Sequence, residues 1–172
     1  MRSLISLALT LSLVLTATAA PGAANPDSGL SIRLAETLQK TLAGNYGSAE
    51  AQVLQQAVSA SVARAMKRAR LTAAGQPYTE VLLSDARPSH PTRHQQSQNP
   101  SIDPVRSRSL GGATLSAVVR DADGKELERV SMDHYATSLE DVSASLDAWA
   151  DARLTIDRFA DQLVKAYRRH PR

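Results

Sequence analysis

Alternating apolar and polar positions along the chain predict four strands. Leu30, Ile32 and Leu34 alternate with polar neighbours, which is typical of a strand with one buried face. Three further β-rich runs occupy residues 78–84, 113–120 and 126–135. Residues 121–124, Asp-Ala-Asp-Gly, separate the last two runs, so we expect these two strands to pair as an antiparallel hairpin.

Two longer segments carry apolar residues at helical spacing. In the first, an apolar residue recurs every four positions, at Leu54, Val58, Val62 and Met66. We expect this helix to begin with Ser48 as its N-cap. The second is predicted for residues 147–168, with a core stripe of Trp149, Ala152, Ile156, Phe159, Leu163 and Tyr167. The order β-α-β-β-β-α predicts an α+β fold, with a mostly antiparallel sheet of about four strands and both amphipathic helices packed on one face.

The first residues have the three regions of a secretory signal peptide: basic Arg2, an apolar run over 4–15, and small residues over 16–24. The apolar run is shorter than the about 20 residues that a membrane-spanning helix needs. We expect cleavage after Ala19 or Ala24, and an uncleaved membrane anchor is the alternative. The sequence therefore predicts a signal peptide at 1–24 and a single α+β domain at 25–172, with no stable transmembrane segment after cleavage.

The chain contains no cysteine. This excludes disulfides, thiolate zinc sites and thiol catalysis, and it excludes a lipoprotein, whose acylation site is a cysteine. Asn99 is followed by Pro100, which makes it unusable for N-glycosylation. Together with abundant Ala, Arg and Leu, these features favour a bacterial protein exported to a periplasm, with secretion as the alternative.

The basic charge is not spread evenly. Residues 25–110 hold ten Lys and Arg against six Asp and Glu, whereas residues 111–172 hold nine against eleven. The chain has one Trp, one Phe and four Tyr, too few for the stacking platforms of single-strand nucleic-acid binders. We therefore expect no nucleic-acid partner.

Residues 86–110 have no regular period and are long for a loop inside a compact domain. The segment contains four prolines and four arginines: Pro88, Pro91, Pro100, Pro104, Arg87, Arg93, Arg106 and Arg108. One interpretation is a binding lid whose four arginines hold an anionic group. The other is a solvated, proline-rich excursion that packs loosely on the sheet.

His90 and His94 have the spacing of two helical zinc ligands, but Pro91 argues against a helix there. We therefore expect both to be surface histidines. Asp133 and His134 are neighbours on a predicted strand, where successive side chains point to opposite faces, so they are not expected to act together.

Other candidate motifs are weaker still. A calcium loop with Gly124 at its sixth position would place Val119 and Val130 at its two ends, where carboxylates are required, so residues 121–124 are expected to be a turn. No G-x-S-x-G elbow is present. Gly111 and Gly112 are expected to form the bend into a strand, with an anion-binding nest as the alternative. The sequence therefore predicts no catalytic residue, no metal site and no cofactor.

Several short runs resemble small exported bacterial proteins of unknown function, namely residues 30–47, 109–113, 120–124, 149–152 and 156–160. The resemblance implies an exported protein with a compact α+β fold and carries no mechanism.

We expect a non-catalytic envelope or periplasmic protein that uses the arginine-bearing segment to bind a partner protein or an anionic envelope component. Two alternatives remain. One is a structural or stress-related scaffold without a partner that depends on this segment. The other is a small hydrolase in which His90 or His94 meets Asp85 or Asp103 in a pocket.

Overall fold

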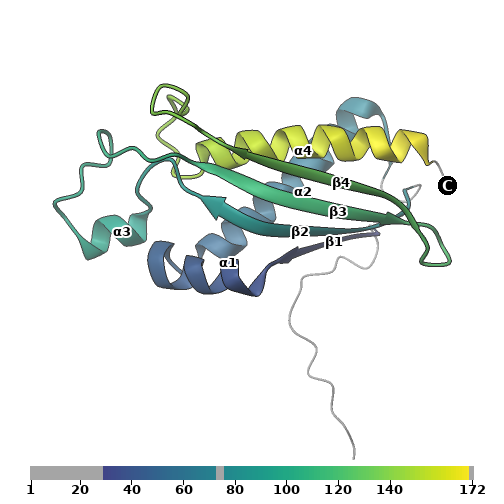
Figure 1. The fold of residues 1–172 in the computed structure, drawn as a ribbon, viewed down its shortest axis with the longest axis horizontal. Helices are drawn as coiled ribbons and strands as arrows, with labels where there is room; N and C mark the ends of the chain where they lie inside the picture. The colour runs from purple at the N-terminus through teal and green to yellow at the C-terminus, as the bar shows by residue number, and fades with distance from the viewer. Residues whose placement is uncertain (1–28, 73–75, 171–172) are drawn as a thin grey trace, which may run out of the picture.

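The computed structural model describes residues 29–72 and 76–170, so the predicted signal peptide at 1–24 lies outside the described residues. Its strands form one sheet in the order β1-β2-β3-β4 (Figure 1). β1 (Leu30–Leu34) runs parallel to β2 (Tyr78–Arg87), whereas β3 (Gly112–Arg120) and β4 (Glu126–Tyr135) complete an antiparallel meander. This confirms the predicted α+β class and the predicted hairpin between the last two strands.

The parallel pair requires a crossover between β1 and β2. It consists of α1 (Glu36–Thr41), the π-helical turn η1 (Leu42–Tyr46) and the long helix α2 (Glu50–Ala69). The two short elements were not predicted, because neither is long enough to show a helical period. Ala49 occupies the N-cap of α2 without a side-chain hydrogen bond, so the predicted Ser48 cap is wrong.

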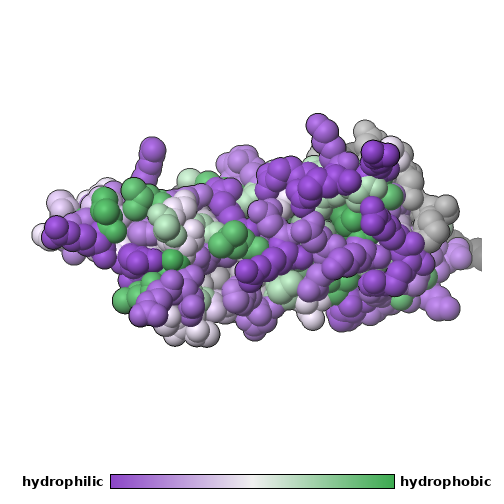
Figure 2. Space-filling view, turned by 90° about the horizontal axis from the view of Figure 1, so that it is seen from above, coloured by the Kyte–Doolittle hydropathy of each residue, from purple (hydrophilic) through white to green (hydrophobic). Residues whose placement is uncertain are grey.

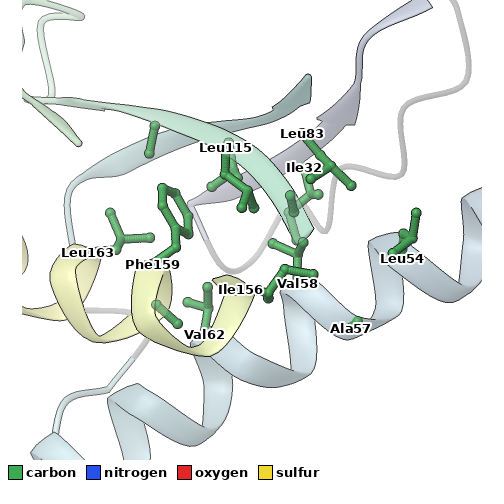
Figure 3. Close-up of a cluster of buried hydrophobic side chains, with 14 of the residues drawn as sticks. Ile32, Leu54, Ala57, Val58, Val62, Leu83, Leu115, Ile156, Phe159 and Leu163 are labelled. Carbon is green, nitrogen blue, oxygen red and sulfur yellow. The ribbon is translucent and has the colours of Figure 1, made fainter. Parts of the chain in front are cut away.

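The hydrophobic core lies between the sheet and two long helices, α2 and α4 (Ala150–Arg169), which pack against each other on one face of the sheet (Figures 1 and 3). Figure 3 shows Phe159 of α4, Val62 of α2 and Leu115 of β3 in one cluster of buried apolar side chains. All six residues of the predicted α4 stripe are buried, which confirms it. The predicted α2 stripe is buried at three positions and half-buried at Met66.

β2 contains a bulge near the end that faces the loops. Its register against β3 shifts between Leu83 and Asp85, so Ser84 is an extra residue. Without it, strict alternation from the buried Leu83 would turn Asp85 and Arg87 toward the core. The bulge reverses the alternation, so that Ala86 is 1% exposed while Asp85 and Arg87 reach the other face.

Beyond the bulge, residues 88–111 cross the loop end of the molecule, defined as the end of the sheet that carries α3 (Arg93–Gln98) in Figure 1. Thr92 and Gln95 form a complete capping box at the start of this short helix. Over residues 29–72 and 76–170, no helix is both long and apolar enough to cross a membrane.

Candidate binding site

Hydrogen bonds fasten the 88–111 segment to the body of the protein. The Ser89 amide donates to the carbonyl oxygen of Ala148 at 2.7 Å, and the Ser109 amide donates to that of Ser89 at 2.9 Å. The Ser109 hydroxyl donates to the Pro88 carbonyl oxygen at 2.7 Å. These bonds satisfy backbone groups that a loosely packed excursion would leave to water, so the segment has a defined shape.

A buried polar cluster lies where this segment meets the start of α4. Ser89 is fully buried and Asp151 is 6% exposed. The Ser89 hydroxyl donates to Asp151 Oδ2 at 2.8 Å, and the Ser143 amide donates to Oδ1 at 2.9 Å. Gly111 lies directly against this pair, because an added Cβ atom would stand 3.0 Å from Asp151 Oδ2 and still closer to Ser89 Oγ. Gly111 is therefore required for close approach, and Gly112 begins β3 as the strand-entry prediction expected.

The 88–111 segment covers a pocket of about 370 Å³, which we call the loop-end pocket. Its wall is largely apolar, and its charged lining is basic, with no carboxylate among the described lining residues. The lining consists of Tyr46, Arg87, Pro88, His90, Pro91, Gln95, Ile102, Ser107, Arg108, Ser109 and Leu110. A mostly apolar pocket with a few polar groups is the usual form of a small-molecule site.

Of the four predicted arginines, the structure brings two to this pocket, Arg87 and Arg108. Arg108 is oriented by a hydrogen bond from Nη2 to the carbonyl oxygen of Val142 at 2.7 Å. Arg106 does not line the pocket: its side chain is 90% exposed, with Nε 3.8 Å from Asp103. Arg93 is the first residue of α3 and is also exposed outside the pocket.

Arg87 is held by a small cluster on the sheet face that the bulge exposes. Its guanidinium carbon lies 4.8 Å from the ring centre of Tyr135, and its Nε lies 3.4 Å from Asp85. The Tyr135 hydroxyl donates to the same carboxylate at 2.8 Å. Burial raises the pKa of Tyr135 to about 12, and the hydrogen bond to Asp85 acts in the same direction. The phenol therefore stays protonated and keeps Asp85 beside Arg87.

His90 is the unexpected member of the site. Its side chain lines the loop-end pocket but is only 3% exposed, so the predicted surface position is wrong for this residue. The difference is tertiary: the backbone at His90 is held against the chain before α4, where the His90 amide lies 3.5 Å from the carbonyl oxygen of Ala148. Neither ring nitrogen has a hydrogen-bond partner among the described residues, so no carboxylate pairs with His90 there. His94 is half-buried in α3 and does not line the pocket.

The remaining polar candidates do not converge on this pocket. His134 borders a second pocket together with Asp141, Asp151 and Arg158, so the lining of that pocket carries both positive and negative charges. Within the described ranges, no cluster of three or more His, Asp or Glu side chains has the arrangement of a metal site.

The segment over the pocket also exposes apolar side chains. Among the described residues, Val105 and Leu110 are large apolar residues that stay exposed, and Leu110 lines the pocket. Figure 2 shows hydrophobic patches at the left end, where Figure 1 places α3. The pocket wall therefore combines two arginines with an exposed apolar side chain.

The sequence pointed to Arg87 and Arg108 through the composition of one segment, but it missed His90, Tyr46 and the apolar wall. The only local signal for His90 is its position between two prolines, Pro88 and Pro91, which restrict the backbone on both sides. Comparisons of the chain with protein-family models, with curated proteins and with solved structures find no match.

Proposed function

We propose that this chain is an exported, non-catalytic envelope protein that binds an anionic component of a bacterial envelope at the loop-end pocket. One observation carries the proposal: Arg87 and Arg108 lie near opposite ends of the 86–110 segment and yet border the same concave site. No carboxylate is found among the described residues that line this site. An anion placed there would meet two guanidinium groups. Arg87 already has Asp85 3.4 Å from its Nε, whereas Arg108 bonds to a backbone carbonyl and forms no ion pair within residues 29–72 and 76–170, so Arg108 offers the freer charge.

The export part of the proposal depends on residues 1–24. Sequencing the N-terminus of the protein from its own host should give a start at Ala20 or Asn25. A mature chain that begins at Met1 would contradict export by cleavage.

Binding is tested by co-sedimentation of the mature protein with vesicles of phosphatidylglycerol and with vesicles of neutral phosphatidylcholine. The decisive variant is Arg87→Gln with Arg108→Gln. The matched control is Arg93→Gln with Arg106→Gln, which removes the same charge from the same segment outside the pocket. We expect the pocket variant to lose about tenfold in affinity for anionic vesicles, about 1.4 kcal/mol, and the control to lose about twofold or less.

Equal losses in the two double variants would contradict the proposal, because they would show attraction to net charge instead of a site. Absence of binding to anionic vesicles, with capture of an acidic protein that depends on Arg87 and Arg108, would replace the lipid component by a partner protein.

A further inference from the structure

Binding of an anion to the two arginines does not explain two features of the loop-end pocket. One is His90, which is 3% exposed and has no partner for either ring nitrogen within residues 29–72 and 76–170. An imidazole carries at least one N–H donor in each of its protonation states. Buried groups of this kind are nearly always paired. Both ring nitrogens of His90 lack accessible surface, so an anion in the pocket pairs with His90 only when the wall around the ring shifts to expose an N–H.

The other unused feature is the apolar wall. Tyr46, Pro88, Pro91, Ile102 and Leu110 supply more of the lining than the charged groups do. A bare inorganic anion would use Arg87 and Arg108 but would leave this wall in contact with water. A purely apolar molecule would cover the wall but leave His90 without a partner. Both features are used together only by a ligand that has a polar head and an apolar body.

The volume sets the size of that ligand. The pocket holds about 370 Å³, near the lower end of the range for small-molecule sites. This is room for one small molecule and too little for a folded partner segment. The second pocket has the same volume, but Asp141 and Asp151 lie in its wall. It is therefore a less favourable environment for an anion.

We infer that the loop-end pocket binds one small amphiphilic anion at a time, with its carboxylate or phosphate head at Arg87 and Arg108 and with a His90 ring N–H donating a hydrogen bond to that head. A short aliphatic body lies against the wall of prolines, Ile102 and Leu110. This inference rests on the proposed function and names the ligand class of the same site. Carboxylate and phosphate heads share the required chemistry, and the experiment separates them.

The first experiment titrates the mature protein with four probes in a calorimeter: octanoate, octyl phosphate, inorganic phosphate and octanol, all as monomers. We expect one octanoate or one octyl phosphate per chain. Either should bind at least about tenfold more tightly than inorganic phosphate, because burying even two methylene groups gives such a factor, and more tightly than octanol, because octanol lacks the anionic head that the arginines hold. The tighter of the two amphiphiles identifies the head group. If inorganic phosphate binds as tightly as octyl phosphate, the apolar wall plays no part and the inference is overturned.

The second experiment tests His90 with His90→Phe and uses His94→Phe as the matched control in the same segment. His90→Phe should weaken binding of the better amphiphile by about tenfold, because one charge-assisted hydrogen bond is lost. Its melting temperature should not fall, since an apolar ring replaces a buried group that has no protein partner. His94→Phe should bind as the wild type does, because His94 lies outside the pocket. Unchanged binding by a folded His90→Phe protein would overturn the role of His90.

Nitrogen NMR of the histidine rings tests the same contact in the wild-type protein and therefore does not depend on the folding of a variant. In the wild-type protein, addition of the bound amphiphile should shift the ring signals of His90 and leave those of His94 in place. Shifts at His94 alone would contradict the inference.

The experiments distinguish failure of this inference from failure of the proposed function. Vesicle binding that depends on Arg87 and Arg108, without binding of any monomeric amphiphile, refutes this inference and leaves the proposed function standing. Vesicle binding that ignores both arginines, together with no amphiphile binding, refutes both.

Discussion

The helix-covered core and the loop end are both well buried, but different forces hold them. In the core, Phe159, Ile156 and Leu115 are at most 1% exposed and contact other apolar side chains. At the loop end, Ser89, His90 and Asp151 are buried to a similar degree, although all three are polar. Burial of apolar area is non-directional and tolerates many arrangements. The loop end depends on particular hydrogen bonds and one close backbone approach, so its stability is more specific to each position.

The largest effect is expected where the core is broken. Phe159→Ala removes a fully buried aromatic ring between α4 and the sheet and should lower the free energy of unfolding by about 3–5 kcal/mol. Leu154→Ala is the control on the same helix, because Leu154 is 48% exposed and should cost less than about 1 kcal/mol. Denaturation in urea, followed by circular dichroism, measures both. Equal losses would show that the helices do not form the principal core.

The next effect tests the polar cluster. Asp151→Ala leaves the Ser89 hydroxyl and the Ser143 amide without their acceptor and should cost about 2–3 kcal/mol. Asp161→Ala is the matched control on α4, since its ion pair with Arg68 is more than half exposed on both sides and contributes less than about 1 kcal/mol. Urea denaturation of the two variants makes the comparison. A loss at Asp151 no larger than at Asp161 would remove the distinction between the loop end and the surface.

Two glycines sharpen the comparison further. Gly111→Ala places a methyl group against Ser89 and Asp151 and should destabilise the protein by about 1–3 kcal/mol through overpacking. Gly44→Ala in η1 meets no atom within 4 Å, and it should be neutral or stabilise by up to about 1 kcal/mol. Thermal denaturation of the pair provides the measurement. Destabilisation at Gly44 alone would contradict the close approach at Gly111.

The smallest effect lies at the opposite end of the sheet, where Glu128 meets Arg169 and His170. Hydrogen bonds from Arg169 hold the pKa of Glu128 below its ordinary value; burial opposes this, and the charges of Arg169 and His170 add to it. Because the folded-state pKa is the lower one, this contribution is present above the unfolded-state pKa and is lost as pH falls through the folded-state pKa.

Glu128→Gln should therefore reduce stability at neutral pH by less than about 1 kcal/mol and by progressively less under acid conditions. Urea midpoints of wild type and variant between about pH 7 and about pH 3 measure the difference. A difference that grows toward acid pH would have the wrong sign for this pair.

Periodic elements were readable from the sequence to within a few residues. The hairpin of β3 and β4 and the stripe on α4 lie where the pattern placed them, because period two and period 3.6 describe one buried face directly. The end of β2 was not readable. Its extra residue at Ser84 reverses the alternation, and only pairing with β3 shows that Asp85 and Arg87 leave the core face.

The candidate site divides in the same way. Composition alone marked the 86–110 segment and its four arginines, since prolines and arginines without a period are visible in a linear chain. Only the pocket distinguishes Arg87 and Arg108 from Arg93 and Arg106. Tyr46 of η1 supplies part of the pocket wall, and the carbonyl oxygen of Val142, before α4, orients Arg108. Neither contact is visible in the sequence of the 86–110 segment.

By itself the sequence determined the α+β class, the two amphipathic helices and the absence of disulfides, because hydrophobic period and residue type act locally along the chain. Only the tertiary structure decided that His90 is buried, that Gly111 lies against Asp151, and that two arginines share one pocket. The physical reason is that burial of a polar residue depends on contacts with parts of the chain that are distant in sequence. The His90 amide, for example, lies 3.5 Å from the carbonyl oxygen of Ala148, and no periodicity around His90 records that contact.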